Sequence, residues 1–147
     1  MKKKILFILL SLCLWGCQTT PQTPTIQLKE HVTLLFFYTQ TCPVCKSFKK
    51  NAIPYLEETF GDAMTIEKYD LDEDATAPIY DQVIDSLVDF DESQYGYGPF
   101  YAVKGYFAKL GYTEGDEEEL AKDISKAVNH QELGYELEAE RFLYKES

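Results

Sequence analysis

A continuously apolar run at residues 34–38 is followed, after three polar residues, by the motif Cys-Pro-Val-Cys at 42–45. A run without polar alternation predicts a β-strand that is covered on both faces, as in a sheet flanked by helices. Pro43 suits the first position of a helix, because its φ is already helical and its missing N–H has no partner there. Thr41 is the expected N-cap. The stretch 33–48 therefore predicts a buried strand, a short turn and the start of a helix.

The two cysteines of this motif have different predicted environments. Cys42 lies at the helix start, where unpaired backbone N–H groups and the positive end of the helix dipole favour a thiolate. Cys45 lies one turn further along, close enough to form a small disulfide ring with Cys42. We therefore expect Cys42 to be the exposed nucleophile and Cys45 to be the thiol that resolves a mixed disulfide.

Further strands and a helix follow the motif. A strand-like run at 64–70 leads to an acidic turn, and a second run begins at Gly98-Pro99 and continues to residue 103. A turn at 104–105 separates this run from another predicted strand. The spacing of apolar residues then predicts a helix over 117–128.

Together with the cysteine motif, this order resembles the thioredoxin superfamily over residues 31–129. The resemblance implies an α/β fold with helices flanking a central mixed β-sheet. The chain before the cis-proline loop is longer than in minimal thioredoxins, so we expect a helical insertion there. It also implies that Gly98-Pro99 is that loop and that the backbone of Gly98 pairs with an extended client beside the sulfurs. An ordinary trans turn is the alternative for Pro99. No cofactor is expected beyond the redox-active disulfide Cys42–Cys45.

Three positions depart from the family's pattern. Phe36 occupies the place of a buried acid, so no carboxylate is available there to accept the proton of the resolving thiol. Thr41 replaces a tryptophan. Val44 offers no cation to a Cys42 thiolate, which leaves mainly the helix terminus to stabilise it. The redox direction is therefore not predicted.

The N-terminal residues 1–16 combine three lysines with a short apolar run, which is the pattern of a secretory signal. The run is too short to cross a bilayer comfortably. The residues Leu-Trp-Gly-Cys at 14–17 resemble the bacterial lipobox, which implies a diacylated Cys17; an ordinary cleavage site is the alternative. Residues 17–30 would then be the lipidated cysteine and a flexible tether. The expected location is extracytoplasmic, at a bacterial membrane to which Cys17 anchors the protein.

The net charge of −11 argues against nucleic acid as a partner and against a polybasic contact with anionic lipid. It is compatible with basic or extended client proteins, although a solvated acidic surface is the commoner explanation. The segment 89–97 is acidic and rich in tyrosine, and it is either a client-selecting element or a plain surface loop. No metal is expected, because His31 and His130 are isolated in the sequence.

Three further expectations concern helices. Pro54 predicts a bend in the first helix, because it cannot donate to the carbonyl of residue 50 and clashes with it. Apolar residues at helical spacing predict an amphipathic helix over 79–90. Residues 130–147 are expected to form a helical extension or a partner-binding tail, although Gly134 weakens the helical prediction.

These features predict a membrane-anchored extracytoplasmic thiol–disulfide oxidoreductase in which Cys42 and Cys45 react. Its partners would be client proteins with thiols or disulfides, and a reductase in that location would also need a membrane redox partner. The alternative is a non-catalytic thioredoxin-like accessory or binding lipoprotein, for instance one that assists export or immunity, with a structural Cys42–Cys45 disulfide.

Overall fold

The computed structural model describes residues 26–146, which are built around a five-stranded sheet in the order β2-β1-β3-β4-β5. The strands are β1 Val32–Tyr38, β2 Met64–Asp70, β3 Phe100–Val103, β4 Phe107–Leu110 and β5 Arg141–Leu143. β1 and β2 run parallel, and the other neighbouring pairs are antiparallel. The predicted α/β class with a mixed sheet is confirmed.

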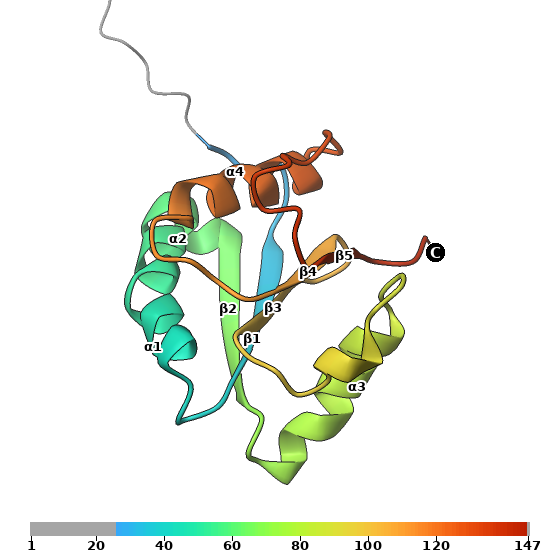
Figure 1. The fold of residues 1–147 in the computed structure, drawn as a ribbon. Helices are drawn as coiled ribbons and strands as arrows, with labels where there is room; N and C mark the ends of the chain where they lie inside the picture. The colour runs from blue at the N-terminus through green and yellow to red at the C-terminus, as the bar shows by residue number, and fades with distance from the viewer. Residues whose placement is uncertain (1–25, 147) are drawn as a thin grey trace, which may run out of the picture.

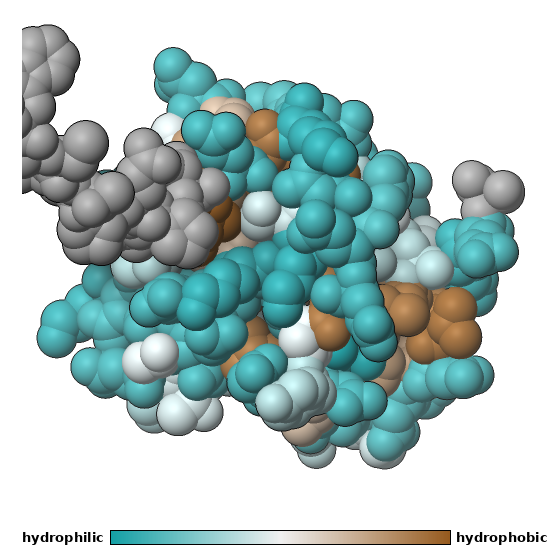
Figure 2. All heavy atoms as spheres, turned by 90° about the horizontal axis from the view of Figure 1, so that it is seen from above, coloured by the Kyte–Doolittle hydropathy of each residue, from teal (hydrophilic) through white to brown (hydrophobic). Residues whose placement is uncertain are grey.

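Helices cover both faces of the sheet, with α1, α2 and α4 on one face and α3 on the other (Figure 1). The helices are α1 Pro43–Lys50, α2 Ala52–Phe60, α3 Ala77–Asp85 and α4 Glu117–Val128, with short 3-10 turns η1 Gly61–Ala63, η2 Asp74–Thr76 and η3 Glu92–Gln94. The end of the molecule that α4 covers presents a mainly hydrophilic surface (Figure 2). α4 has the bounds that the sequence predicts.

β1 contributes to the cores on both sides of the sheet, as its unbroken apolar run predicts. Leu34 and Phe36 face the helices α1, α2 and α4, whereas Leu35 and Phe37 face α3, because successive side chains of a strand point to opposite faces. Phe48 of α1 stacks on Phe36 with ring centroids 4.7 Å apart. This stacking holds α1 against β1.

The first long helix is interrupted, as Pro54 predicts. α1 and α2 are separated at Asn51, whose backbone has φ −111° and ψ −58°. Pro54 has no N–H to donate to the carbonyl of residue 50, so the regular pattern is lost at this turn. The Asn51 N–H still donates to the Ser47 carbonyl at 2.9 Å, so a helical hydrogen bond joins the end of α1 to the start of α2.

The helix predicted over 79–90 is shorter than expected, because α3 ends at Asp85. The residues that follow pair with the C-terminal segment instead, and the Val88 N–H donates to the Leu143 carbonyl at 2.8 Å. Asp89 then has a φ of 52°, a left-handed conformation that does not continue a helix. The helical insertion expected before the cis-proline loop is only the single turn η3.

Within the described residues, the C-terminal segment forms neither an added helix nor a free tail. It ends in β5, which pairs with β4 at the edge of the sheet. The Asp123 carboxylate on α4 accepts from the Gly134 N–H and from Arg141, each at 2.9 Å. The Lys109 Nζ donates to the Ala139 carbonyl at 2.7 Å. These contacts hold the segment against the domain, so the prediction of a helix is wrong.

Candidate functional site

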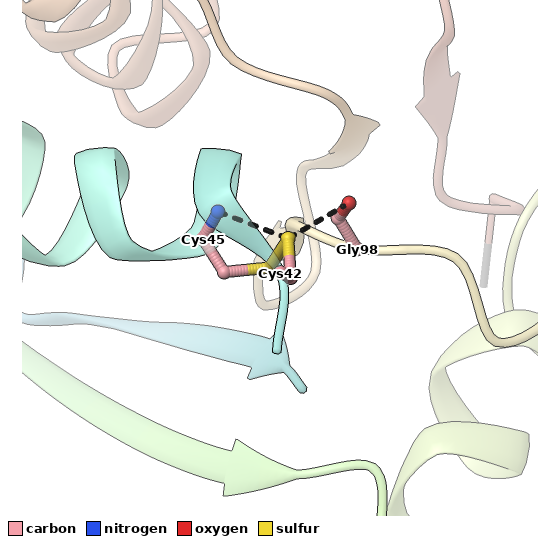
Figure 3. Close-up of a disulfide and its surroundings, with 3 residues drawn as sticks. All are labelled: Cys42, Cys45 and Gly98. Atoms are coloured by element: carbon pink, nitrogen blue, oxygen red, sulfur yellow. Dashed lines mark hydrogen bonds between the residues drawn. A yellow bond between two sulfur atoms is a disulfide. The ribbon is translucent and has the colours of Figure 1, made fainter. Parts of the chain in front are cut away.

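The Cys-Pro-Val-Cys motif follows the turn after β1 and forms the N-cap and first turn of α1 (Figure 3). Pro43 is the first helical residue, as predicted, but the N-cap is Cys42, with φ −74° and ψ 113°. The prediction that Thr41 caps the helix is therefore wrong. The Cys42 Sγ takes the place of a capping oxygen and accepts from the Cys45 N–H at 3.0 Å. The cap thus places the sulfur among the unpaired N–H groups of the first turn.

Cys42 and Cys45 form a disulfide, and their Cα atoms are 5.2 Å apart. Cys42 is partly exposed, whereas Cys45 is completely buried on the inner face of α1. A reactant in solvent therefore reaches the sulfur of Cys42 and not that of Cys45. This difference is the one that a nucleophilic and a resolving cysteine require. Val44, between them, is 41% exposed and provides an apolar surface beside the disulfide.

The Gly98-Pro99 peptide bond is cis, as predicted, and lies beside the disulfide (Figure 3). The Gly98 carbonyl oxygen is 3.5 Å from the Cys42 Sγ, so a reduced Cys42 thiol can donate to it. The φ of Gly98 lies outside the left-handed region, and glycine is needed here for space. A Cβ at this position would be 3.1 Å from the Cys45 Sγ. The structure thus brings Cys42, Cys45, Gly98 and Pro99 together.

Gly98→Ala is expected to raise the reduction potential of the disulfide by roughly 20 to 60 mV. The added Cβ presses on a sulfur that the disulfide holds in place. In the reduced protein the Cys45 thiol can rotate away, so the overpacking cost of about 1–3 kcal/mol falls mainly on the oxidised form. Redox titration of the wild-type and variant proteins measures the shift in reduction potential. Thermal unfolding of the oxidised and reduced forms shows which form the substitution destabilises. An unchanged or more negative potential would contradict this account.

Lys49 lies over an aromatic ring rather than beside the sulfurs. Its Nζ is 2.9 Å from the centroid of the Tyr38 ring, a cation–π contact. Burial lowers the pKa of Lys49, and the carboxylate of Asp70 opposes this shift. Lys46 and Lys50, the other lysines of α1, are exposed. The helix terminus is therefore the main stabilising influence on a Cys42 thiolate.

Asp70 is a buried carboxylate near the motif that the sequence analysis missed. It ends β2 beside Tyr38, the last residue of β1, and its Oδ2 accepts from the Gln40 Nε2 at 2.5 Å. This bond ties the turn before Cys42 to the neighbouring strand. The signal was available, because the carboxyl ends of parallel strands meet at one edge of a sheet and bring their polar residues together. Phe36, by contrast, is fully buried among aromatic rings.

Several predictions concern other parts of the chain. The signal 1–16, Cys17 and the tether up to residue 25 lie outside the described residues. Within residues 26–146, no helix has the length and apolar character needed to span a membrane. His31 and His130 line one pocket of about 420 Å³. The same part of the chain contains no group of three or more His, Cys, Asp or Glu side chains arranged to hold a metal ion.

Comparisons of the chain with protein-family models, with curated proteins and with solved structures find no match in any of the three. The function therefore has to be inferred from the chemistry of the site. That chemistry combines a solvent-accessible disulfide sulfur at a helix start, a buried partner sulfur and a backbone carbonyl directly beside them.

Proposed function

We propose that this chain is a thiol–disulfide oxidoreductase with a thioredoxin-like fold, anchored outside the cytoplasm at a bacterial membrane through a lipidated Cys17. The observation that carries the proposal is the placement of the disulfide. Cys42 is partly exposed at the start of α1, with its Sγ 3.5 Å from the Gly98 carbonyl oxygen, while Cys45 is buried. The mixed sheet with α1, α2 and α4 on one face and α3 on the other supports the fold.

The exchange proceeds through a mixed disulfide on Cys42 in either direction. In the reducing direction, the Cys42 thiolate attacks a client disulfide and releases one client thiolate. The Cys45 thiolate then attacks the Cys42 sulfur, releases the second client thiolate and forms the Cys42–Cys45 bond. In the oxidising direction, a client thiolate attacks the Cys42 sulfur of the disulfide and releases Cys45 as a thiolate. A second client thiolate then attacks the client sulfur and leaves both cysteines reduced.

The partly exposed backbone of Gly98 beside Cys42 favours a polypeptide as the reactant. The Gly98 carbonyl borders the reactive sulfur, and an extended client segment can pair with the backbone at this position. A hollow of about 790 Å³ lies elsewhere, lined by Tyr106, Leu133, Tyr135 and Arg141 among others, and it contains neither cysteine. Clients are therefore expected to be extracytoplasmic proteins with thiols or disulfides. A reductase there would also need a membrane redox partner.

A structural disulfide is the second candidate, and one observation favours it. Phe36 is buried where a carboxylate would assist the resolving thiol, and Asp70 is bonded to Gln40 instead. A structural disulfide between these two cysteines would contribute little to stability, however. Closing a loop of four residues stabilises a fold by about 2 kcal/mol, compared with about 4.7 kcal/mol for a loop of 100 residues. The accessory-lipoprotein function therefore ranks second.

Cys45→Ser is expected to trap client proteins on Cys42 as covalent adducts. Without the Cys45 thiol, the mixed disulfide has no intramolecular attacker and decays only by exchange with external thiols. The full-length variant is expressed in bacterial cells. Acid quenches thiol–disulfide exchange, an alkylating reagent then blocks the free thiols, and the adducts are separated on non-reducing gels. Bands that disappear with dithiothreitol are the expected result.

The matched control is the double variant Cys42→Ser/Cys45→Ser, which retains any lipidation at Cys17 but has no exposed thiol in the motif. It should form no such adducts. If the Cys45→Ser protein gives no thiol-sensitive adducts beyond those of the double variant, the exchange mechanism loses its main support, and the structural disulfide becomes the better explanation.

A further inference from the structure

Residues 89–97, which we call the acidic segment, run from the edge of the sheet, where Val88 pairs with Leu143 of β5, to Gly98 beside the disulfide. The Tyr95 hydroxyl donates to Asp81 on α3 at 2.5 Å, and its ring lies edge-on against Tyr80 at 5.0 Å between centroids. The Gly96 N–H donates to the Tyr80 hydroxyl at 3.2 Å. At the other end of the segment, Asp91 accepts from the Ser93 N–H at 2.9 Å. The segment is thus held by α3 before any client arrives.

The C-terminal segment supports the acidic segment from a second side. The Gln94 Nε2 donates to the Glu140 Oε1 at 3.3 Å. The Glu140 carbonyl accepts from the Leu110 N–H at 3.0 Å, and the next residue, Gly111, donates its N–H to the Pro99 carbonyl at 2.8 Å. The acidic segment, Glu140 and the Gly98-Pro99 loop are therefore connected by hydrogen bonds. A surface that is already ordered loses less entropy when it binds a client.

Apolar and aromatic side chains are exposed on this surface. Within residues 26–146, six large hydrophobic side chains are exposed, and three of them belong to the motif or to the acidic segment. These three are Val44 at 41%, Tyr95 at 47% and Tyr97 at 62%. Tyr97 directly precedes Gly98, whose carbonyl borders the Cys42 sulfur. Exposed tyrosines bury a large area at a small entropic cost and are common anchors in protein interfaces.

Between the end of β2 and β3 the sequence carries charge of one sign, although Lys145 of the C-terminal segment donates to the Asp85 carbonyl of α3 at 2.6 Å. Residues 69–103, from the end of β2 through α3 to β3, contain nine Asp and Glu residues and no Lys, Arg or His. Asp89, Asp91 and Glu92 are exposed, and in the part of the chain that the structure describes none of them forms an ion pair. The basic residues Lys46 and Lys50 belong to α1, on the other side of the motif. A client with positive charge is attracted toward the acidic segment.

We propose that the acidic segment selects clients whose reacting cysteine is flanked by an aromatic or apolar residue and by lysine or arginine. The inference rests on the proposed function, since it assigns a substrate class to the same site. Tyr97 and Val44 contact the apolar flank, and Asp89, Asp91 and Glu92 attract the basic residues. Selection by charge acts mainly on the rate of encounter, so it weakens as salt rises.

The test uses the oxidised full-length protein in detergent and nine-residue peptides that each contain one reduced cysteine. The peptides carry Tyr or Ser beside the cysteine and either two lysines or two glutamates at its flanks. Flanking charge also changes the reactivity of the peptide thiol itself. Each rate constant is therefore divided by the rate of the same peptide with hydroxyethyl disulfide, which is neutral. The lysine peptides are expected to react about tenfold faster than the glutamate peptides at 20 mM salt, and the ratio should fall toward one at 0.5 M.

Two matched variants locate the effect. Asp89→Asn/Asp91→Asn/Glu92→Gln keeps the size of each side chain, and asparagine tolerates the left-handed backbone of residue 89. It should remove most of the charge preference. Glu57→Gln/Glu58→Gln/Asp62→Asn removes three exposed carboxylates near the far end of the sheet, where β2 begins, and should leave the preference intact. Tyr97→Ser should reduce the advantage of the Tyr peptides over the Ser peptides severalfold.

The experiment distinguishes failure of the proposed client selection from failure of the proposed oxidoreductase function. If all peptides and small thiols exchange with the disulfide but the charge preference is absent, or persists in the 89/91/92 variant, the selection by the acidic segment is overturned and the oxidoreductase stands. If neither peptides nor dithiothreitol exchange with the disulfide in the folded protein, the proposed function fails, and the inference fails with it. A preference that is lost in the 89/91/92 variant and retained in the 57/58/62 variant supports both.

Discussion

The Cys42→Ser protein is expected to have no thiol–disulfide exchange activity while it keeps its fold. The remaining motif thiol, Cys45, is 0% exposed on the inner face of α1, so neither a client nor a small disulfide can reach it. Serine is among the best N-cap residues, and its hydroxyl oxygen can accept from the Cys45 N–H as the sulfur does. The fold should therefore lose only the loop-closure contribution of the disulfide, about 2 kcal/mol. Rates with a cysteine peptide and with hydroxyethyl disulfide measure the loss of activity.

Alkylation gives this prediction a second readout. In folded Cys42→Ser protein, the Cys45 thiol should be inert to iodoacetamide, and it should react once the protein is unfolded in guanidinium chloride. In folded, reduced Cys45→Ser protein, Cys42 should react readily, because it is partly exposed. Mass spectrometry of the peptide that contains residues 42–45 separates these thiols from the cysteines near the N-terminus. Exchange activity in the Cys42→Ser protein, or rapid alkylation of its folded Cys45, would contradict the assigned roles.

Arg141→Met is expected to lower the free energy of unfolding by about 3–5 kcal/mol. Arg141 donates to the Asp123 Oδ2 at 2.9 Å and to the Gly134 carbonyl at 2.8 Å, and the Asp123 side chain is only 4% exposed. The substitution leaves a buried carboxylate with the Gly134 N–H and with Lys126, whose Nζ is 3.9 Å away. Urea denaturation measures the loss. Hydrogen exchange should also be faster at β4, whose partner strand begins at Arg141.

Lys122→Met is the matched control for this prediction, because Lys122 also pairs with carboxylates of α4. Its Nζ lies 2.8 Å from Glu118 and 2.7 Å from Glu119, but all three side chains are at least a third exposed. Solvent-exposed ion pairs contribute little, so this substitution should leave the unfolding midpoint almost unchanged. If both substitutions lowered the free energy of unfolding equally, burial would not determine how much each ion pair contributes to stability.

The parts of the site that the sequence predicts are those that local chemistry specifies. Three features can be interpreted from a few neighbouring residues: the spacing of the cysteines, Pro43 at the helix start and the unbroken apolar run of β1. Gly98-Pro99 could be placed beside the sulfurs only through the order of the elements around it. The capping residue was misplaced because a threonine hydroxyl is ordinarily the stronger cap, whereas here the Cys42 sulfur accepts the hydrogen bond.

The features that the sequence does not predict depend on contacts between distant segments. α3 ends early because the residues after it pair with residues 143–145, which no local pattern near Asp85 indicates. The strand β5 is only three residues long and forms at the free edge of β4. The Gln40–Asp70 bond and the contact of Lys49 with Tyr38 likewise follow from the pairing of β1 with β2 and from the packing of α1. In each case tertiary contact decides what the local sequence leaves open.

The chain is acidic overall, and its acidic segment carries exposed tyrosines. A net charge of −11 opposes self-association through charge repulsion. The α4 end shows a mainly hydrophilic surface (Figure 2). The acidic segment also exposes Tyr95 and Tyr97, and Tyr95 is held by Asp81 and by Tyr80. The hydrogen bond to Asp81 raises the pKa of Tyr95 to about 12, so this phenol keeps its proton and the anchoring bond over the physiological range.

The most direct test of the central claim is the equilibrium reduction potential of the Cys42–Cys45 pair in the full-length protein. The protein is titrated against glutathione and dithiothreitol buffers, and each redox form is quantified by alkylation of the peptide that contains residues 42–45. An exchange catalyst must be able to both form and break this bond, so the account predicts a potential between roughly −120 and −270 mV. A potential below about −300 mV would contradict it and would identify the bond as a structural disulfide.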